Sequence, residues 1–164
     1  MKFIVYEVLN NERCFMFQIA YMSFMSKNFD PKNKDLVESI LHTARENNAR
    51  LGVTGMLIFQ DGVFFQLLEG EKDVVLNLYG RICSDLRHQF QRVLVKQESN
   101  SRVFGNWSMG FHDSSKLTRD QLLMLKAWKE MRNDTQEGKE VSPDKIWEFF
   151  ATLRFGLDAS DIAA

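Results

Sequence analysis

The sequence predicts an α+β fold of the ferredoxin-like kind, a βαββαβ sheet with both helices on one face. Two observations lead to this prediction. First, two apolar runs of β type meet at Asp61-Gly62, a dipeptide typical of a tight hairpin because both residues tolerate a positive φ. Second, a segment with apolar residues at helical spacing lies on each side of this hairpin, and a further β-type run lies beyond each segment.

The part of the chain before the hairpin supplies one strand and one helix. The strand is predicted over about residues 17–24, where side chains of two alternating sets point to opposite faces. Asp30-Pro31 then has the pattern of an N-cap followed by proline in the first helical turn, so the helix is predicted over about 32–49. Its apolar stripe consists of Leu36, Val37, Ile40, Leu41 and Ala44.

The hairpin itself and the segments after it complete the sheet. The run from Val63 to Leu68 is apolar on both faces, which is typical of a central, buried strand. The following elements are predicted to be a helix over about 72–88, a fourth strand over 92–97 and a fifth strand over about 106–111. In this last strand Trp107, Met109 and Phe111 are predicted to share one face.

We divide the chain into a leader of uncertain order (residues 1–15), one domain (16–112) and a C-terminal helical appendage (113–164). The appendage contains two predicted helices, over about 118–131 and 143–154. We expect it to dock on the domain or on a partner, through the contact residues Trp128, Trp147, Phe149 and Phe150.

Composition excludes several classes of function. A formal net charge of −1 over 164 residues gives no electrostatic footprint for direct nucleic acid binding, and no apolar run is long enough to span a membrane. Cys14 and Cys83 lack metal-ligand spacing and are interpreted as reduced thiols of a cytoplasmic protein. The three histidines are widely separated, so no metal site is expected.

Gln66 is the most informative single residue. It lies within the central apolar strand, where an unpaired carboxamide would cost about 1–3 kcal/mol, so we expect a polar partner inside the fold. The simpler alternatives are a glutamine bonded to backbone and a Tyr21 that only fills the core. The strands that carry Tyr21 and Gln66 are predicted to be the two central strands and to run parallel. If they and the last strand present Tyr21, Gln66 and Met109 to the helices, these side chains become neighbours below the slot between the helices, near Asn48.

Several short motifs occur in order over residues 16–112. They are Tyr21-Met22-Ser23, Ala44-Arg45-x-Asn47-Asn48, Gly52-Val53-Thr54-Gly55, Gly62-Val63-Phe64-Phe65-Gln66-x-Leu68-Glu69-Gly70, Asp85-x-Arg87-His88 and Trp107-Ser108-Met109. Together they closely resemble the BLUF family of blue-light sensors, which use flavin adenine dinucleotide (FAD). The resemblance implies a flavin held between the two helices of a ferredoxin-like domain.

The resemblance also implies residue roles. Tyr21 would donate an electron and a proton to the excited flavin, and Gln66 would rearrange its hydrogen bonds to give a red-shifted signalling state. This rearrangement is the switch, and the switch residues that would surround it are Ser23, Trp107 and Met109. The twelve residues expected to bind the cofactor are Tyr21, Ser23, Ile40, Asn47, Asn48, Phe64, Gln66, Arg81, Asp85, Arg87, His88 and Met109.

The resemblance is to short, non-enzymatic members of the family, because nothing after residue 112 resembles an output enzyme. We therefore expect signalling through an unidentified protein partner and through a homo-oligomer. Two alternatives belong to other classes: a flavin-dependent redox enzyme, disfavoured because no Gly-x-Gly-x-x-Gly motif is present, and a ferredoxin-like interaction module without cofactor.

Overall fold

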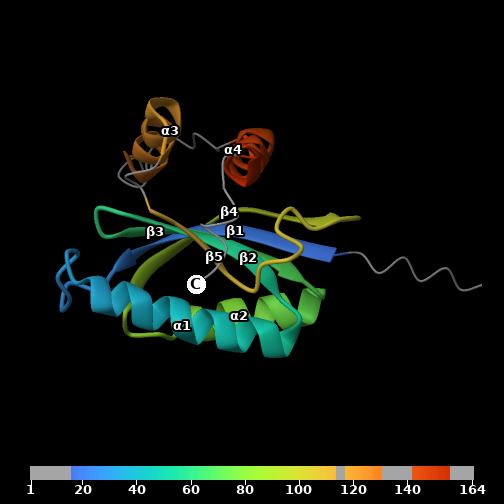
Figure 1. Cartoon of the computed structure of the whole chain (residues 1–164), viewed down its shortest axis with the longest axis horizontal. Helices are drawn as coiled ribbons and strands as arrows, with labels where there is room; N and C mark the ends of the chain where they lie inside the picture. The colour runs from blue at the N-terminus through green and yellow to red at the C-terminus, as the bar shows by residue number, and fades with distance from the viewer. Residues whose placement is uncertain (1–15, 114–116, 131–141, 156–164) are drawn as a thin grey trace, which may run out of the picture.

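The computed structural model of the protein describes residues 16–113, 117–130 and 142–155. Over these ranges five strands form one sheet that has two helices on each face (Figure 1). The elements in chain order are β1 (Met16–Met25), α1 (Lys34–Leu51), β2 (Thr54–Gln60), β3 (Val63–Gly70), α2 (Lys72–Cys83), β4 (His88–Ser99), β5 (Gly110–Asp113), α3 (Arg119–Glu130) and α4 (Pro143–Phe155). The predicted α+β, ferredoxin-like class is confirmed.

The strand order is β4-β1-β3-β2-β5, with β1 and β3 in the centre. The prediction that the two central strands are parallel was wrong: β1 pairs with β3 antiparallel. The reason is the connectivity, since β3 returns from β2 through a tight hairpin and enters the sheet between β2 and β1. In the β1–β3 register Tyr21 lies directly opposite Gln66, so both side chains point to the same face.

The hairpin between β2 and β3 has the predicted turn. Asp61 and Gly62 have φ of 48° and 76°, the paired positive values of a two-residue turn that matches the twist of the flanking strands. This turn fixes the register in which Leu57 lies opposite Gln66.

Helix α1 begins two residues later than predicted. Its N-cap is Asn33, whose side chain accepts a hydrogen bond from the Leu36 amide (3.2 Å). Asp30, the predicted N-cap, instead accepts from the Lys32 amide (2.9 Å) and shapes the turn that precedes the helix.

Helix α2 ends at Cys83, five residues earlier than predicted, and His88 begins β4. The Asp85 carboxylate accepts from the backbone amide of Arg87 (2.9 Å), a local bond that offers the chain a turn in place of another helical turn. His88 therefore lies on the sheet and not on the helix.

Strand β5 begins at Gly110, so Trp107 and Met109 lie in the loop before it and not in the predicted strand. The Trp107 amide donates to the Phe104 carbonyl (3.0 Å), which makes a turn there. The β5 strand pairs parallel with β2.

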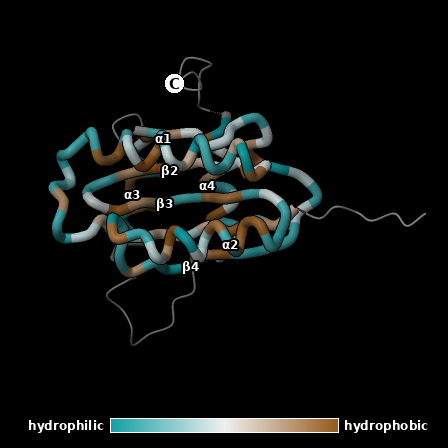
Figure 2. Tube along the Cα trace, turned by 90° about the horizontal axis from the view of Figure 1, so that it is seen from below, coloured by the Kyte–Doolittle hydropathy of each residue, from teal (hydrophilic) through white to brown (hydrophobic). Residues whose placement is uncertain are grey.

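Both faces of the sheet are covered. The helix-side cluster, between the sheet and α1 and α2, has as buried members Phe17, Ile19, Tyr21, Met25, Val37, Ile40, Leu41, Val53, Leu57, Phe64, Leu68, Val75, Leu78 and Met109. Seen from this side, β3 runs between the two helices (Figure 2). The cap-side cluster, below α3 and α4, has as buried members Ala20, Met22, Met56, Ile58, Val63, Phe65, Leu67, Val95, Phe104, Leu117, Leu125, Ile146, Phe149, Phe150 and Leu153.

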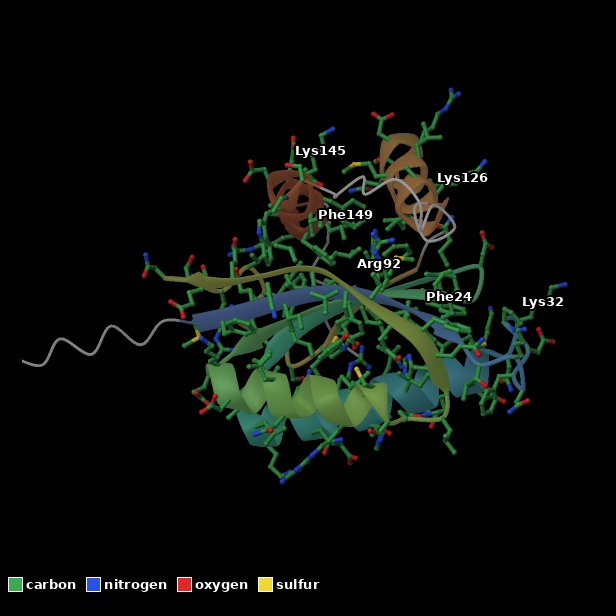
Figure 3. The ribbon with its side chains drawn as sticks, turned by 180° about the vertical axis from the view of Figure 1, so that it is seen from behind. Phe24, Lys32, Arg92, Lys126, Lys145 and Phe149 are labelled. Carbon is green, nitrogen blue, oxygen red and sulfur yellow. The ribbon has the colours of Figure 1, made fainter. Side chains whose placement is uncertain are left out.

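Helices α3 and α4 lie over the sheet face that faces away from α1 and α2. Phe149 lies between α4 and the sheet, whereas Lys126 and Lys145 point outward (Figure 3). No helix within the described ranges is long and apolar enough to cross a membrane. The predicted leader, residues 1–15, lies outside the described residues.

Candidate functional site

A buried hydrogen bond joins the centres of the two middle strands. The Tyr21 hydroxyl of β1 donates to Oε1 of Gln66 on β3, and both side chains are almost inaccessible to solvent, with 0% and 5% exposed. The other end of the carboxamide, Nε2, lies 3.6 Å from the Met109 sulfur. The predicted trio of Tyr21, Gln66 and Met109 is thus brought together, although the strands run in the opposite relative direction to the one expected.

The phenol of Tyr21 is held in its neutral form. Burial raises the pKa of the Tyr21 hydroxyl well above its ordinary value, and Tyr79, Cys83 and Asp85 add to the rise. The ring of Tyr79 on α2 meets the Tyr21 ring edge-on, with centroids 4.9 Å apart. Because an electron can leave a neutral phenol readily only if its proton leaves as well, the hydrogen-bond partner of Tyr21 decides its chemistry.

Tyr79 is a site residue that the sequence analysis missed. Tyr79 follows buried Leu78 by one residue and buried Val75 by four, so it continues the apolar stripe of α2. This helical spacing indicates that its side chain faces the sheet. Burial raises the pKa of the Tyr79 hydroxyl well above its ordinary value, and the neighbouring Cys83 thiol adds to the rise.

A second polar group lies beside the pair at the start of β4. His88 Nδ1 is 3.0 Å from the Ser23 hydroxyl, and the imidazole lies 4.6 Å from the Phe64 ring, centroid to centroid. Burial lowers the pKa of His88 to about 4, which outweighs the opposing effect of the Asp85 carboxylate. His88 is therefore a neutral imidazole near pH 7.

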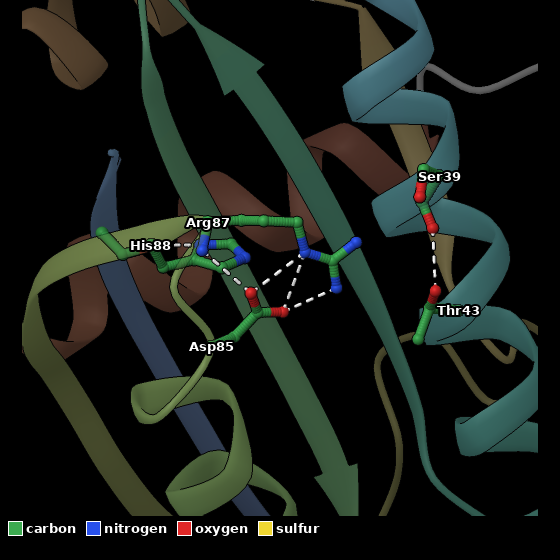
Figure 4. Close-up of polar contacts among 6 residues, drawn as sticks. Ser39, Thr43, Asp85, Arg87 and His88 are labelled. Carbon is green, nitrogen blue, oxygen red and sulfur yellow. Dashed lines mark hydrogen bonds and ion pairs between the residues drawn. The ribbon is translucent and has the colours of Figure 1, made fainter. Parts of the chain in front are cut away.

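Asp85 and Arg87 form an ion pair next to His88 (Figure 4). The guanidinium donates to the carboxylate through Nη2 (2.6 Å) and Nε (3.0 Å), and these bonds lower the pKa of Asp85. Both side chains remain about a quarter exposed, so the pair sits at the rim and not in the core.

A cleft opens between α1 and α2 above the Tyr21–Gln66 pair. Its lining comes from α1, β3, α2 and the turn into β4: Ile40, Thr43, Ala44, Asn47, Asn48, Gln66, Leu78, Arg81, Ile82, Asp85, Arg87 and His88. The cleft thus gathers eight of the twelve predicted cofactor-binding residues, Ile40, Asn47, Asn48, Gln66, Arg81, Asp85, Arg87 and His88. Tyr21, Phe64 and Met109 lie below it in the helix-side cluster, and Ser23 contacts His88.

Helix α1 also holds the loop that carries Met109. Asn48 donates from Nδ2 to the Ser108 carbonyl (2.7 Å), and Arg45 donates from Nε to the Met109 carbonyl (3.1 Å). From β2, the Gly55 amide donates to the Trp107 carbonyl (3.1 Å). The sequence analysis missed the role of Arg45, although its place in the Ala44-Arg45-x-Asn47-Asn48 motif was a signal.

Trp107, a predicted switch residue, lies on the opposite side of the sheet from Gln66. Its ring stacks on Phe104, with centroids 5.4 Å apart, and packs against the cap-side cluster. The side chains of Met109 and Trp107 therefore contribute to opposite faces of the sheet.

The residues of the cleft fit a flavin nucleotide. Ile40 and Ala44 on one helix and Leu78 and Ile82 on the other supply apolar walls for a flat ring. The carboxamides of Asn47, Asn48 and Gln66 supply both donors and acceptors for its polar edge. Arg81 and Arg87 supply positive charge for phosphates. Among the residues that the structure describes, no group of histidine, cysteine and acidic side chains has the arrangement of a metal site.

Comparison with known proteins agrees with this geometry. The family model described as "Sensors of blue-light using FAD" matches residues 16–110. The antirepressor BluF of Escherichia coli K12, described as blue light- and temperature-regulated, is 31% identical over 124 residues, which cover 76% of this chain but 30% of BluF. Photoactivated adenylate cyclase subunit beta of Euglena longa is 39% identical over 70 residues, or 43% of this chain and 8% of the cyclase.

Solved structures extend the similarity to nearly whole proteins. The dark-state structure of BlrB, a BLUF protein, has a TM-score of 0.65 and 26% identity, with 88% of this chain and 99% of BlrB covered. The photo-activated state of BlsA has a TM-score of 0.65 and 27% identity, with 85% and 94% covered. Since the family model matches more than half of the sequence, this chain belongs to the BLUF family of FAD-dependent blue-light sensors.

Proposed function

We propose that this protein is a blue-light photoreceptor that binds oxidised FAD non-covalently in the cleft between α1 and α2. The observation that carries the proposal is the buried hydrogen bond from Tyr21 to Gln66 at the base of that cleft. A phenol and a carboxamide buried together provide a mobile proton and a group that can accept it, with no general base, nucleophile or metal needed.

Residues around the cleft have distinct proposed roles. Ile40, with Phe64 below, would flank the flavin ring, and Asn47 and Asn48 would bind its polar edge. Arg81, on the α2 wall, would make further contacts with the nucleotide. Asp85 would orient Arg87 through their ion pair, and His88 would keep Ser23 in place through its hydrogen bond.

Bound FAD supplies absorption of blue light and, once excited, an oxidant strong enough to take an electron from a phenol. Tyr21, which is buried and neutral, must then release its hydroxyl proton, and Gln66 Oε1 is the acceptor in contact with it. An amide protonated on oxygen can release a proton from its nitrogen, and bound flavin that had taken the electron would be the group to accept it, because the Met109 thioether beside Nε2 is too weak a base. Gln66 thereby changes which groups it donates to and accepts from, and Met109 lies beside the amide group that changes.

The output is proposed to be a change in protein–protein contact, with a homo-oligomer as one form, in the cytoplasm. Two observations support this part. The structural relatives BlrB and BlsA are covered almost completely by this chain, and BluF is described as an antirepressor. A protein partner is therefore the expected recipient of the signal, and the cap formed by α3 and α4 is the part of the described chain best placed to meet it.

The proposal is tested by an absorption spectrum of the purified, FAD-loaded protein before and after blue light. A small red shift of the flavin band that reverses in the dark supports the photoreceptor. Bleaching to a reduced flavin without a red shift would instead support a flavin-dependent redox enzyme. A protein that takes up no flavin would support an interaction module.

A further inference from the structure

Glu69 stands out among the buried polar residues because the proposed light reaction does not use it. It is fully buried, and it is the only buried acidic side chain among those that the structure describes. It follows Gln66 on β3 by three residues, so its side chain points to the opposite, cap-side face. In the sheet register it lies between Gln18 of β1 and Thr54 of β2.

The Glu69 carboxylate accepts hydrogen bonds from three elements. Oε2 accepts from Gln18 Nε2 (2.7 Å) and from the Val103 amide (2.6 Å). Oε1 accepts from the Phe104 amide (2.8 Å) and, more weakly, from the Thr54 hydroxyl (3.4 Å). Two consecutive backbone amides on one carboxylate are strong, charge-assisted bonds, which compensate for burial of the charge. Glu69 therefore ties residues 103–104 to the middle of the sheet.

The tied residues begin the segment that carries Met109. Phe104, held by Glu69, precedes Met109 by five residues, and the Phe104 ring stacks on Trp107 between them. The α1 contacts at the far end, from Asn48 and Arg45, come from a helix that also forms a wall of the flavin cleft. The Glu69 contacts lie on the other face of the sheet and do not touch the cleft.

We propose that Glu69 is a positioning residue for the light reaction: its carboxylate anchors Val103 and Phe104, and this anchor holds Met109 against Gln66. The inference rests on the proposed photoreceptor function. Met109 can oppose a rotation or proton shift of the Gln66 amide only while the segment that carries it is fixed. The anchor thus sets the barrier that the lit state crosses when it returns to the dark state.

The substitution Glu69→Gln tests the anchor with almost no change of volume. Each carboxylate oxygen accepts from one backbone amide, so either orientation of a glutamine places an NH₂ group against the Val103 or the Phe104 amide. One of the two backbone bonds is therefore lost, whichever way the side chain turns. The flavin cleft keeps all of its residues.

The experiment follows decay of the red-shifted absorbance in the dark after a blue pulse, using the full chain loaded with FAD. Glu69→Gln is expected to bind FAD and to form the red-shifted state, but to return to the dark state faster by about threefold or more. The matched control is Val37→Ala, which creates a cavity at the start of α1, away from the Glu69 anchor and from the residues that line the cleft. It should lower the melting temperature yet recover at the wild-type rate.

A second measurement needs no variant. Hydrogen exchange of the wild-type Val103 and Phe104 amides should be slow in the dark and under blue light, because both bonds to Glu69 persist. Fast exchange at these amides would overturn the anchor even if Glu69→Gln failed to fold. A folded Glu69→Gln protein with wild-type recovery, or a Val37→Ala protein accelerated equally, would overturn the positioning role. With either of these outcomes, a normal red shift in the wild-type protein would leave the proposed photoreceptor function standing. Absence of the red shift in the wild-type protein would overturn the photoreceptor function and the positioning role together.

Discussion

The two faces of the central sheet are built from the same strands, yet they bury polar groups of different kinds. On the face toward α1 and α2 the buried polar groups include a phenol, a carboxamide and a neutral imidazole, in Tyr21, Gln66 and His88. On the face toward α3 and α4, Glu69 is a carboxylate held by several donors. Neutral groups joined by single bonds can exchange partners, whereas a charge bound by two backbone amides cannot do so cheaply. The helix-side face is suited to switching and the cap-side face to anchoring.

Tyr21→Phe is expected to have the largest effect on the switching face. It removes the only hydroxyl bonded to Gln66 Oε1 in the described structure and keeps the ring against Tyr79. The protein should fold and bind FAD, but the normal red shift should disappear. Difference spectra after a blue pulse provide the measurement, and wild-type cycling in Tyr21→Phe would refute the donor assignment.

Gln66→Leu should also remove the normal red shift while flavin binding is retained. Leucine has similar volume but can neither accept the Tyr21 proton nor donate toward Met109. It also leaves the buried Tyr21 hydroxyl without this partner, at a cost of about 1–3 kcal/mol in the free energy of unfolding. Spectra and urea denaturation of the same preparation separate the two effects; an unchanged red shift would contradict the role of the amide.

Phe149→Ala on α4 should show the reverse pattern to the substitutions at Tyr21 and Gln66: the stability should fall and the red shift should remain. The side chain is 1% exposed and belongs to the cap-side cluster, so its removal should lower the free energy of unfolding by about 3–5 kcal/mol. The size of the red shift should remain that of wild type, because no residue of the cleft lining changes. A variant of wild-type stability, or one folded but without the red shift, would break the comparison.

The pH dependence of stability sharpens the same comparison with a smaller effect. The pKa of His88 is about 4 in the folded protein and about 6.5 in the unfolded chain, so the unfolded state binds the extra proton between these values. The contribution of His88 to the free energy of unfolding is therefore fully present above pH 6.5, and up to about 3 kcal/mol of it is lost as the pH drops toward 4. The pKa of Asp85 is lowered, so the stabilising contribution of its carboxylate is lost only at pH values below about 4, the ordinary aspartate pKa.

Chemical denaturation of wild type and His88→Gln between pH 7 and pH 4.5 measures this contribution. The wild-type free energy of unfolding should decline with a slope that His88→Gln lacks. Equal slopes in the two proteins would show that His88 is not a neutral buried group.

Much of this fold could be predicted from sequence because local patterns determine it. The Asp61-Gly62 turn set the hairpin, and period-two alternation placed Tyr21 and Gln66 on one face. The relative direction of the central strands was predicted wrongly, since it depends on where the hairpin enters the sheet and not on any residue pattern. The position of a strand within a sheet is a long-range property.

The boundaries that failed were decided by side chains bonding to backbone. The end of α2 depends on the Asp85 carboxylate bonding to the Arg87 amide, and helical periodicity alone does not show that competition. The residues Trp107 to Met109 alternate like a strand, but α1 side chains hold this loop in place of a sheet ladder. The cleft itself was found because its residues carry short motifs, whereas Tyr79 belongs to an ordinary helical stripe.

The Tyr21–Gln66 bond spans 45 residues of sequence, and this separation has a consequence for how the protein is made. The β2–β3 hairpin can form locally and early, but its pairing with β1 must close a long loop and is correspondingly slow. Until that pairing occurs, neither the phenol nor the floor of the cleft is in place. A newly synthesised chain therefore gains light sensitivity only after β1 has paired with the hairpin. Because FAD would then bind the completed domain and not its precursors, cofactor supply acts as a thermodynamic pull on folding itself.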